Sequence, residues 1–327
     1  MIRVVYFGTP AFAAPALEAL TGDSRFDIRL VVTQPDRPAG RGRKLESSAV
    51  AATAHALGLP LYQPASLRTA EAREPLAAAE ADLFVVAAFG LIFGKATLAL
   101  PRLGCLNLHG SLLPKYRGAS PVQAAILNGD EVTGITLMKM DAGLDTGAAI
   151  ATIEEPIRPD DTTESLMARL GQAGATLALD AIPAYVSGDL APVPQPVDGA
   201  TETRTIAKAD GWIVWTDSAD AIERRVRAMW PWPRAWTTVE GTPLQIHRAS
   251  VVEESPADAP GTALHVDGAL VVACGSGALR LDVVQPAGRS AMSGAAFAAG
   301  RRSDRIDLGC EGAPAATPPL IRPAATA

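Results

Sequence analysis

Cysteine is scarce in this sequence, and long apolar runs are missing from it. Three cysteines, Cys105, Cys274 and Cys310, are scattered over 327 residues and form no CxxC pair. An odd, scattered set argues against a disulfide framework and against a cysteine zinc site, so we expect a reduced, cytoplasmic protein without a metal. The apolar run from Ile2 to Gly8 is too short for a signal peptide, and no stretch approaches the ~20 apolar residues of a membrane span.

Two sequence motifs of common enzyme classes are missing as well. The first turn offers Gly8 and no GxGxxG follows, which leaves a dinucleotide cofactor unsupported. There is no GxSxG elbow, and Ser111 has no second histidine to activate it, so nucleophilic serine catalysis is not expected. A net charge of −6 argues against indiscriminate nucleic-acid binding, although affinity depends on local charge rather than on the total.

What is present is a globular chain long enough for two domains. Hydrophobic residues make up 48% of it and charged residues 20%, an ordinary balance for a folded protein. In the first half, β-rich runs alternate with helical spacing, as in Ile2–Phe7 followed by Phe12–Leu20. Leu83–Phe89 is almost entirely apolar, as a parallel strand covered on both faces is. We therefore predict an α/β fold, a Rossmann-like, doubly wound, mostly parallel sheet, as the first domain, over residues 1–189.

The second half of the chain has a different pattern. Residues 190–207 are polar and punctuated by prolines, which is typical of a linker. After a predicted helix at Ala219–Met229, short β-like runs separated by Gly and Pro predict a small, OB-like C-terminal β-barrel over 208–309. Residues 310–327 are rich in Pro and Ala without periodicity, so we expect a disordered tail there.

His109 stands out among the four histidines because of its position. It ends an apolar strand that we expect to begin at Cys105, and ligands of open α/β sheets bind at the carboxyl ends of strands. A histidine there can act as a general acid or base near neutral pH. Asn107 lies two residues earlier and therefore points to the same face of the strand. The other histidines are expected to have structural roles: His55, His247 and His265.

Asp145 supplies a carboxylate to the same candidate site. It follows Asp141 in a loop framed by Gly143 and Gly147, whose backbone can approach a ligand closely. A carboxylate beside an imidazole fixes its tautomer and stabilises its charged form. An amide such as that of Asn107 can donate a hydrogen bond to a developing oxyanion. Without a nucleophile, this set of residues suits direct transfer of an activated carbonyl group to an external amine.

These residues belong to a longer segment that is recognisable. Leu106–Pro114 reads LNLHGSLLP, and Asp145 follows His109 by thirty-six residues. The combination resembles the folate-dependent formyltransferases, whose α/β domain takes a formyl group from 10-formyltetrahydrofolate. The resemblance implies that Asn107, His109 and Asp145 are catalytic. It also implies a folate pocket formed by Phe89, Gly90, Leu91, Ile92, Ser111, Leu112, Leu113, Pro114, Asp141 and Gly143. From the residues alone, Leu91 and Ile92 fit a plain core role equally well.

A cationic loop interrupts the otherwise acidic first half. Its charges, +3 in sum with Asp36, come from Arg37, Arg41, Arg43 and Lys44. The glycines and prolines between them forbid a helix, so a mobile arm can follow a phosphate backbone, and four phosphate contacts predict a log–log salt slope of about −3 to −4. From the residues alone, a merely solvated loop is the simpler interpretation. The loop is similar, however, to the insertion with which formyltransferases acting on methionyl-tRNA contact the acceptor end.

Segments outside the catalytic core point to the same branch of the superfamily. Formyltransferases that act on methionyl-tRNA have segments similar to Phe7–Ala13, Tyr116–Pro121 and Trp230–Pro233 of this sequence. The C-terminal domain resembles an auxiliary tRNA-binding domain, and a helix there presents cations to RNA or to solvent: Arg224, Arg225 and Arg227. Two departures occur. Val214 stands where the family usually has an acidic residue before a tryptophan, and the stretch from Arg301 onward is not the usual acidic, then aromatic, end.

The resemblance implies an activity and a partner. We expect transfer of the formyl group to the α-amino group of methionine on initiator methionyl-tRNA, with no membrane and no obligatory protein partner. The alternative is an enzyme that formylates a sugar-nucleotide amine, which would explain the core and the second domain but not the cationic loop. A purine-pathway enzyme would leave the second domain unexplained. A folate- or RNA-binding protein without transfer activity would require that Asn107, His109 or Asp145 be missing, and all three are present.

Overall fold

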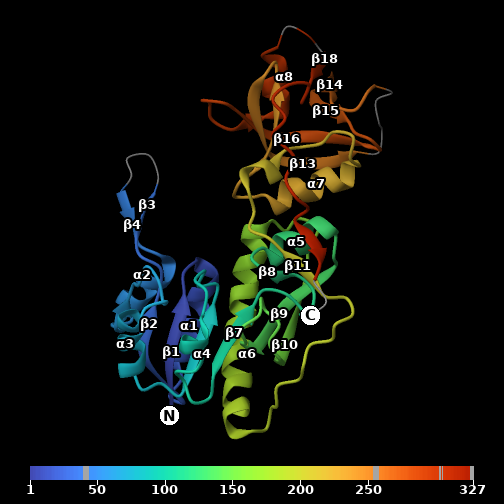
Figure 1. Ribbon diagram of the computed structural model, residues 1–327. Helices are drawn as coiled ribbons and strands as arrows, with labels where there is room; N and C mark the ends of the chain where they lie inside the picture. The colour runs from blue at the N-terminus through green and yellow to red at the C-terminus, as the bar shows by residue number, and fades with distance from the viewer. Residues whose placement is uncertain (40–43, 253–257, 302, 304, 325–327) are drawn as a thin grey trace.

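A seven-stranded sheet organises the N-terminal half of the protein. The computed structural model describes residues 1–39, 44–252, 258–301, 303 and 305–324 (Figure 1). The strand order is β10-β9-β7-β6-β1-β2-β5, in which β9 runs antiparallel to its neighbours β7 and β10 and all other pairings are parallel. The predicted Rossmann-like, mostly parallel sheet is confirmed. Its strands are β1 (Ile2–Gly8), β2 (Phe26–Val32), β5 (Leu61–Tyr62), β6 (Leu83–Ala87), β7 (Cys105–His109), β9 (Val132–Lys139) and β10 (Ala149–Pro156).

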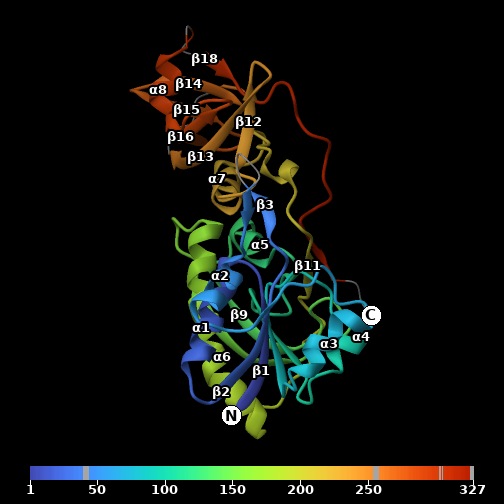
Figure 2. The same ribbon diagram turned by 90° about the vertical axis from the view of Figure 1, so that its left-hand side faces the viewer.

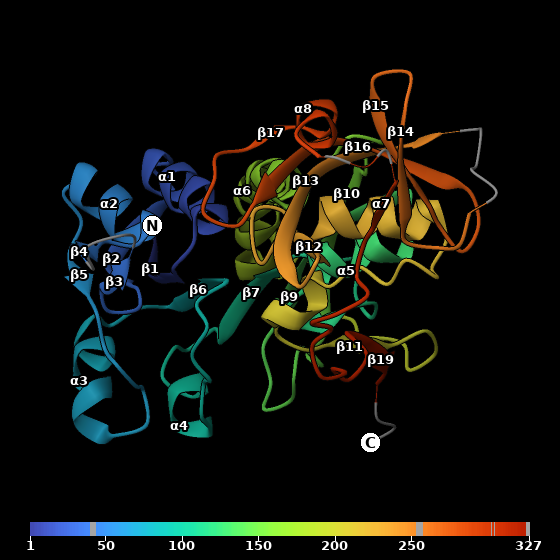
Figure 3. The same ribbon diagram turned by 90° about the horizontal axis from the view of Figure 1, so that it is seen from above.

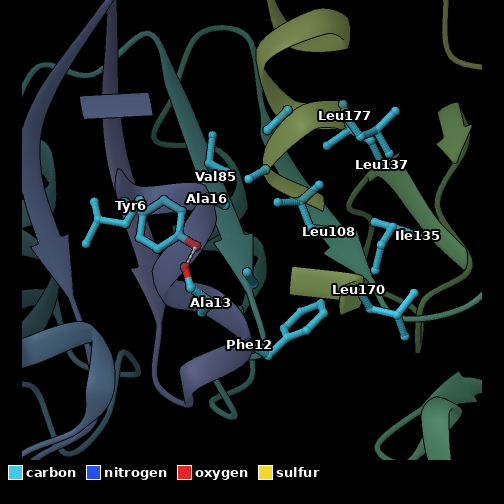
Figure 4. Close-up of a cluster of buried hydrophobic side chains, with 14 of the residues drawn as sticks. Tyr6, Phe12, Ala13, Ala16, Val85, Leu108, Ile135, Leu137, Leu170 and Leu177 are labelled. Atoms are coloured by element: carbon cyan, nitrogen blue, oxygen red, sulfur yellow. Dashed lines mark hydrogen bonds between the residues drawn. The ribbon is translucent and has the colours of Figure 1, made fainter. Parts of the chain in front are cut away.

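Helices cover both faces of this sheet, as the view from above shows (Figure 3). Alternate residues of β1 point to opposite faces, so Tyr6 packs in the core under α1 and α6 whereas Phe7 packs on the side of α3. In the first of these cores the Tyr6 hydroxyl donates to the carbonyl oxygen of Ala13 (Figure 4). The helices are η1 (Ala11–Ala13), α1 (Ala14–Gly22), α2 (Ala49–Ala56), α3 (Ala70–Ala78), α4 (Lys95–Leu98), α5 (Pro121–Asn128) and α6 (Thr163–Ser187).

A curled antiparallel sheet forms the C-terminal domain, as predicted. Its strand order is β12-β13-β16-β15-β14-β18, with β17 paired to β16. A bridge between Val239 and Leu308 joins the ends of the first and last strands, so the sheet closes on itself. The elements are η2 (Lys208–Gly211), α7 (Ala219–Ala228), β12 (Ala235–Val239), β13 (Thr242–Val252), β14 (Thr262–Val266), β15 (Ala269–Ala273), β16 (Ala278–Pro286), β17 (Met292–Ser293), α8 (Gly294–Ala299) and β18 (Arg305–Asp307).

Helix α7 joins the two domains by packing against α5 (Figure 1). Arg224 Nε donates to the Leu127 carbonyl oxygen at 3.2 Å, and Arg227 Nη1 donates to that of Asp161 at 2.9 Å. Arg225 Nη1 donates to the carbonyl oxygen of Asp210 at 2.9 Å. The arginines of this helix therefore bond to protein carbonyls, two of them across the domain interface.

A small third sheet contradicts the expectation of a disordered tail. Its strands are β8 (Arg117–Gly118), β11 (Thr201–Thr203) and β19 (Ile321–Pro323), with β11 in the middle. Figure 2 shows the C-terminal segment, in red, running from the C-terminal domain down to the side of β11. Up to Ala324, the last described residue, the tail is ordered because its backbone completes this sheet and Ile321 packs against the cluster of Tyr116, Ala124 and Ala125. No local sequence pattern reveals these contacts.

The cationic loop is a hairpin in the described residues. Strands β3 (Arg37–Ala39) and β4 (Lys44–Glu46) pair with Arg37 opposite Glu46 and Ala39 opposite Lys44. Arg41 and Arg43 lie outside the described residues. Among the helices of the described part of the chain, none combines the length and apolar character needed to cross a membrane.

Candidate active site

A cavity of about 700 Å³ opens at the carboxyl edge of the parallel sheet. Its walls come from the segments that follow β6, β7 and β9 and from the start of α5. The three predicted catalytic residues, Asn107, His109 and Asp145, all line it. Asn107 and His109 lie two residues apart on β7, whose carboxyl end lies at this edge, and the loop that follows β9, the antiparallel neighbour of β7, brings Asp145 beside them.

His109 is the last residue of β7, and its side chain is 6% exposed. Its Nε2 lies 2.9 Å from the carbonyl oxygen of Tyr116. Because a carbonyl oxygen can only accept, Nε2 carries the proton in this contact, and Nδ1 is the nitrogen left to gain or lose one. Nδ1 faces Asp145, 3.6 Å from Oδ2.

Asp145 is held by its carboxylate as well as by its loop. The backbone N–H of Gly118 donates to Oδ2 at 2.8 Å, and Asn107 Nδ2 lies 3.5 Å from Oδ1. The φ angle of Asp145 is 52°, in the left-handed region, where a residue other than glycine is uncommon. The predicted carboxylate–imidazole pair is thus present, with the amide of Asn107 on the other carboxylate oxygen.

The predicted folate residues divide into two groups. Six of them line the cavity with the triad: Phe89, Gly90, Leu91, Ile92, Asp141 and Gly143. Ile92 is 82% exposed, which excludes a plain core role for it. Gly90 has a φ of 82°, in the left-handed region. The side-chain amide of Gln34 donates to the Phe89 carbonyl oxygen at 2.8 Å, and a Cβ on residue 90 would overlap that amide. The glycine therefore permits the shape of this wall.

The loop Ser111–Pro114 does not lie where we expected it, in the wall of the folate pocket. None of its residues is among the described residues that line the cavity. Ser111 is fully buried and its hydroxyl donates to the Lys115 carbonyl oxygen at 2.6 Å. The N–H of Leu113 donates to Thr136 Oγ1 at 3.0 Å. Instead of lining the cavity, these residues are bonded to β9 and to the turn that leads into Tyr116.

Three contacts of the site were not anticipated from the sequence. They are the Tyr116 carbonyl on the histidine, the Gly118 N–H on the carboxylate, and a linker glutamine described below. The first two are backbone groups, which no side-chain pattern reports.

Burial and the neighbouring Asp130 carboxylate raise the pKa of the Tyr116 phenol. The phenol therefore stays protonated and donates to that carboxylate at 2.8 Å. Within the described residues, no group of three or more His, Cys, Asp or Glu could hold a metal ion.

Comparison with known proteins assigns this geometry to a family. Residues 2–182 match the formyl transferase family model, and residues 205–302 match that of the formyl transferase C-terminal domain. A methionyl-tRNA formyltransferase from Thiobacillus denitrificans is 51% identical over 302 residues, which cover 92% of this chain and 97% of that protein. The chain belongs to the methionyl-tRNA formyltransferase family. It is therefore an enzyme, a formyl transferase.

Solved structures share the fold of this methionyl-tRNA formyltransferase family member at lower identity. A methionyl-tRNA formyltransferase from Clostridium thermocellum aligns with a TM-score of 0.55 at 16% identity, over 78% of this chain and 96% of that one. An N-formyltransferase from Helicobacter canadensis, solved with folinic acid and dTDP-3-aminofucose, aligns with a TM-score of 0.65 at 18% identity, over 88% of this chain and 100% of that one. At such identities both likenesses concern the fold alone.

Proposed function

We propose that this chain transfers the formyl group of 10-formyltetrahydrofolate to the α-amino group of methionine on initiator methionyl-tRNA, in the cytoplasm. The observation that carries the proposal is the convergence of Asn107, His109 and Asp145 on one cavity in a chain of this family. The proposed reaction needs no metal and no second protein chain.

The shape and chemistry of the cavity fit a folate. Its walls at Phe89–Phe93 and Met140–Leu144 are mostly apolar, and polar side chains gather where Asn107 and Asp145 lie. Small-molecule sites combine a mostly apolar wall with a few placed polar groups, and they commonly measure about 300–1,000 Å³. 10-Formyltetrahydrofolate would supply the formyl group as a co-substrate, and we assign its ring to the walls around Leu91 and Gly143.

The polar end of the cavity provides what formyl transfer to an amine requires. In such a transfer the amine nitrogen bonds to the formyl carbon, which builds negative charge on the formyl oxygen and releases a proton from the amine. The bond from that carbon to N10 of the folate then breaks, and N10 takes up a proton as tetrahydrofolate leaves. The Asn107 amide is placed to donate to that oxygen, an interaction that contributes about 3 kcal/mol in comparable sites. His109 receives the proton at Nδ1, because its Nε2 is bonded to the Tyr116 carbonyl oxygen. Asp145, at 3.6 Å, then stabilises the imidazolium.

The β3–β4 hairpin is proposed to hold the acceptor end of the tRNA. The hairpin and the C-terminal domain both project from the side of the sheet where the strands end (Figure 1), and from above they lie apart (Figure 3). A polynucleotide that reaches both would have its end near the cavity. We assign phosphate contacts to the cations of the hairpin: Arg37, Arg41, Arg43 and Lys44.

One assay tests the acceptor directly. Purified protein is supplied with 10-formyltetrahydrofolate and with either methionyl-tRNA or a dTDP-linked amino sugar, and formylated product is measured. We expect formyl-methionyl-tRNA as the product. Formylation of the amino sugar alone would overturn the proposal in favour of the sugar-nucleotide activity, which rests at present on fold likeness alone.

A further inference from the structure

Gln195, in the linker between the two domains, contacts both backbone segments that hold the catalytic carboxylate. Its Nε2 donates to the carbonyl oxygens of Asp145 at 2.8 Å and Gly147 at 2.7 Å. Its Oε1 accepts two hydrogen bonds from the guanidinium group of Arg117, at 3.0 and 2.8 Å. One amide thus joins the loop that carries the carboxylate to strand β8, whose Gly118 N–H binds that carboxylate.

The backbone around Gln195 is itself restrained. Pro194 and Pro196 flank it, which fixes two φ angles and removes two N–H donors. Two residues before it, Val193 pairs with Ala149 of β10 through hydrogen bonds of 2.8 and 2.7 Å. Gln195 is half-buried, whereas the valine and both prolines are exposed. The linker therefore turns its glutamine toward the site and its apolar residues toward solvent.

Asp145 has a backbone that needs such a restraint. Its left-handed conformation, with φ of 52°, is disfavoured for a residue with a side chain, and persists where the surroundings fix it. Gly118 holds the carboxylate at 2.8 Å and Gln195 holds the carbonyl oxygen at 2.8 Å, so the residue is fixed at both ends. Without the contact to the carbonyl oxygen, the carboxylate is free to turn away from His109 Nδ1.

We propose that Gln195 is a positioning residue for Asp145. It is not among the described residues that line the cavity, so it acts through the loop and not on the substrate. The expected loss of kcat in Gln195 variants rests on the proposed function. The expected effect on the loop of residues 143–147 rests on geometry alone.

Two substitutions in the full chain separate the contacts of this amide. Gln195→Met keeps the length of the side chain and removes every hydrogen bond. Gln195→Glu keeps an acceptor for Arg117 and loses both donors to the carbonyl oxygens. Val197→Ala, at a linker residue that is 72% exposed, is the matched control. The measurements are kcat, both KM values, the pH–rate profile and amide hydrogen exchange of residues 143–147.

We expect Gln195→Met and Gln195→Glu to lower kcat about 10²-fold, the loss that follows a misplacement of about 1 Å. Both KM values should change less than about threefold, because no binding contact is removed. The pH–rate profile should change shape, since the carboxylate no longer faces the imidazole, and residues 143–147 should exchange faster. The control should match the wild type.

The outcomes distinguish this inference from the proposed function. A Gln195→Glu rate equal to that of the wild type would overturn the inference, since the bonds to the carbonyl oxygens would then be dispensable. Unchanged kcat, pH profile and exchange in Gln195→Met would overturn it as well. If the wild type formylates no methionyl-tRNA but the substitution still speeds exchange in the loop, the proposed function fails and the positioning role stands.

Discussion

The two ring nitrogens of His109 have separate partners. Nε2 is bonded to the Tyr116 carbonyl oxygen at 2.9 Å, and Nδ1 faces Asp145 at 3.6 Å. The backbone contact fixes the ring plane, and the carboxylate stabilises the charged ring. In the proposed reaction, proton transfer is thereby restricted to Nδ1, in a side chain that is 6% exposed.

Replacing His109 with alanine should lower kcat about 10²- to 10⁴-fold, the usual contribution of a general acid or base. Binding of methionyl-tRNA should be nearly unchanged, because the residue contributes only at the cavity. Steady-state kinetics with tRNA binding measured separately tests this. His55→Ala, an exposed histidine on α2, is the control. Near-normal turnover of the His109 variant would remove it from the catalytic set.

The three cysteines should differ sharply in reactivity. Burial raises the pKa of the Cys105 thiol to about 12 and that of Cys274 to about 11, whereas Cys310 is exposed. The thiolate is the reactive form, and only a small fraction of either buried thiol is ionised at pH 8. Titration of the native protein with an aromatic disulfide should show one fast thiol at pH 8, and three after denaturation. Three fast thiols in the native state would contradict the packing around Cys105.

The convergence of Asn107, His109 and Asp145 could be predicted from the sequence, and the contacts that support it could not. Asn107 and His109 lie two apart at the end of an apolar strand, and Asp145 sits between glycines, so residue types and spacing carry the signal. The partners are different in kind. A carbonyl group at Tyr116 and an N–H at Gly118 exist in every sequence, and Gln195 lies fifty residues from the carbonyl it binds.

Among the elements, β19 is the least expected from composition. The Ala/Pro-rich segment lacks any period, yet Thr317 Oγ1 donates to Asp210 Oδ1 at 3.0 Å, and the Pro318 carbonyl oxygen accepts from Arg204 at 2.6 Å. These partners lie more than a hundred residues away in the sequence. A strand such as Leu83–Ala87, by contrast, is apparent from its continuous apolar run, because burial on both faces is a local property of the sequence.

Ile321→Asp should destabilise the protein and loosen β8. The side chain is half-buried against Tyr116, so removing it and placing a charge there should cost about 1–2 kcal/mol in the free energy of unfolding. Urea unfolding and amide exchange at residues 116–118 measure the effect. Arg322→Ala on the same strand breaks only a surface ion pair with Glu202 and should cost under about 1 kcal/mol. Equal stability of Ile321→Asp and the wild type would refute the role of β19.

At the scale of the whole molecule, positive charge gathers in one segment of a protein whose net charge is negative. The chain carries −6, yet the sequence of the hairpin is cationic, and β3 and β4 project from the side of the sheet where the parallel strands end (Figure 1). The helix α7, which also carries arginines, uses them at the domain interface. The hairpin is therefore the cationic feature to which we assign the salt dependence of tRNA binding.

Replacing Arg41 and Arg43 with alanine should weaken tRNA binding and flatten its log–log salt slope by about 1.4–1.8, since each phosphate contact contributes about 0.7–0.9. The dissociation constant measured across a salt series tests this. The control is the double variant Arg25→Ala and Arg102→Ala. Both arginines are exposed, and both precede strands, so they lie at the opposite edge of the sheet. A slope identical in the hairpin variant and the wild type would exclude the hairpin from phosphate binding.

The sheet beside the active site is completed by a strand, β19, that is synthesised long after β8. Strand β8 contacts β11, and β11 pairs with β19 at Ile321–Pro323. About two hundred residues separate β8 from β19, so at a synthesis rate of roughly 5–20 residues per second their appearance differs by roughly 10–40 s. Until β19 has been made, β11 lacks its partner strand on one edge. The nascent enzyme therefore acquires its fully supported active site only after Ile321–Pro323 has been synthesised.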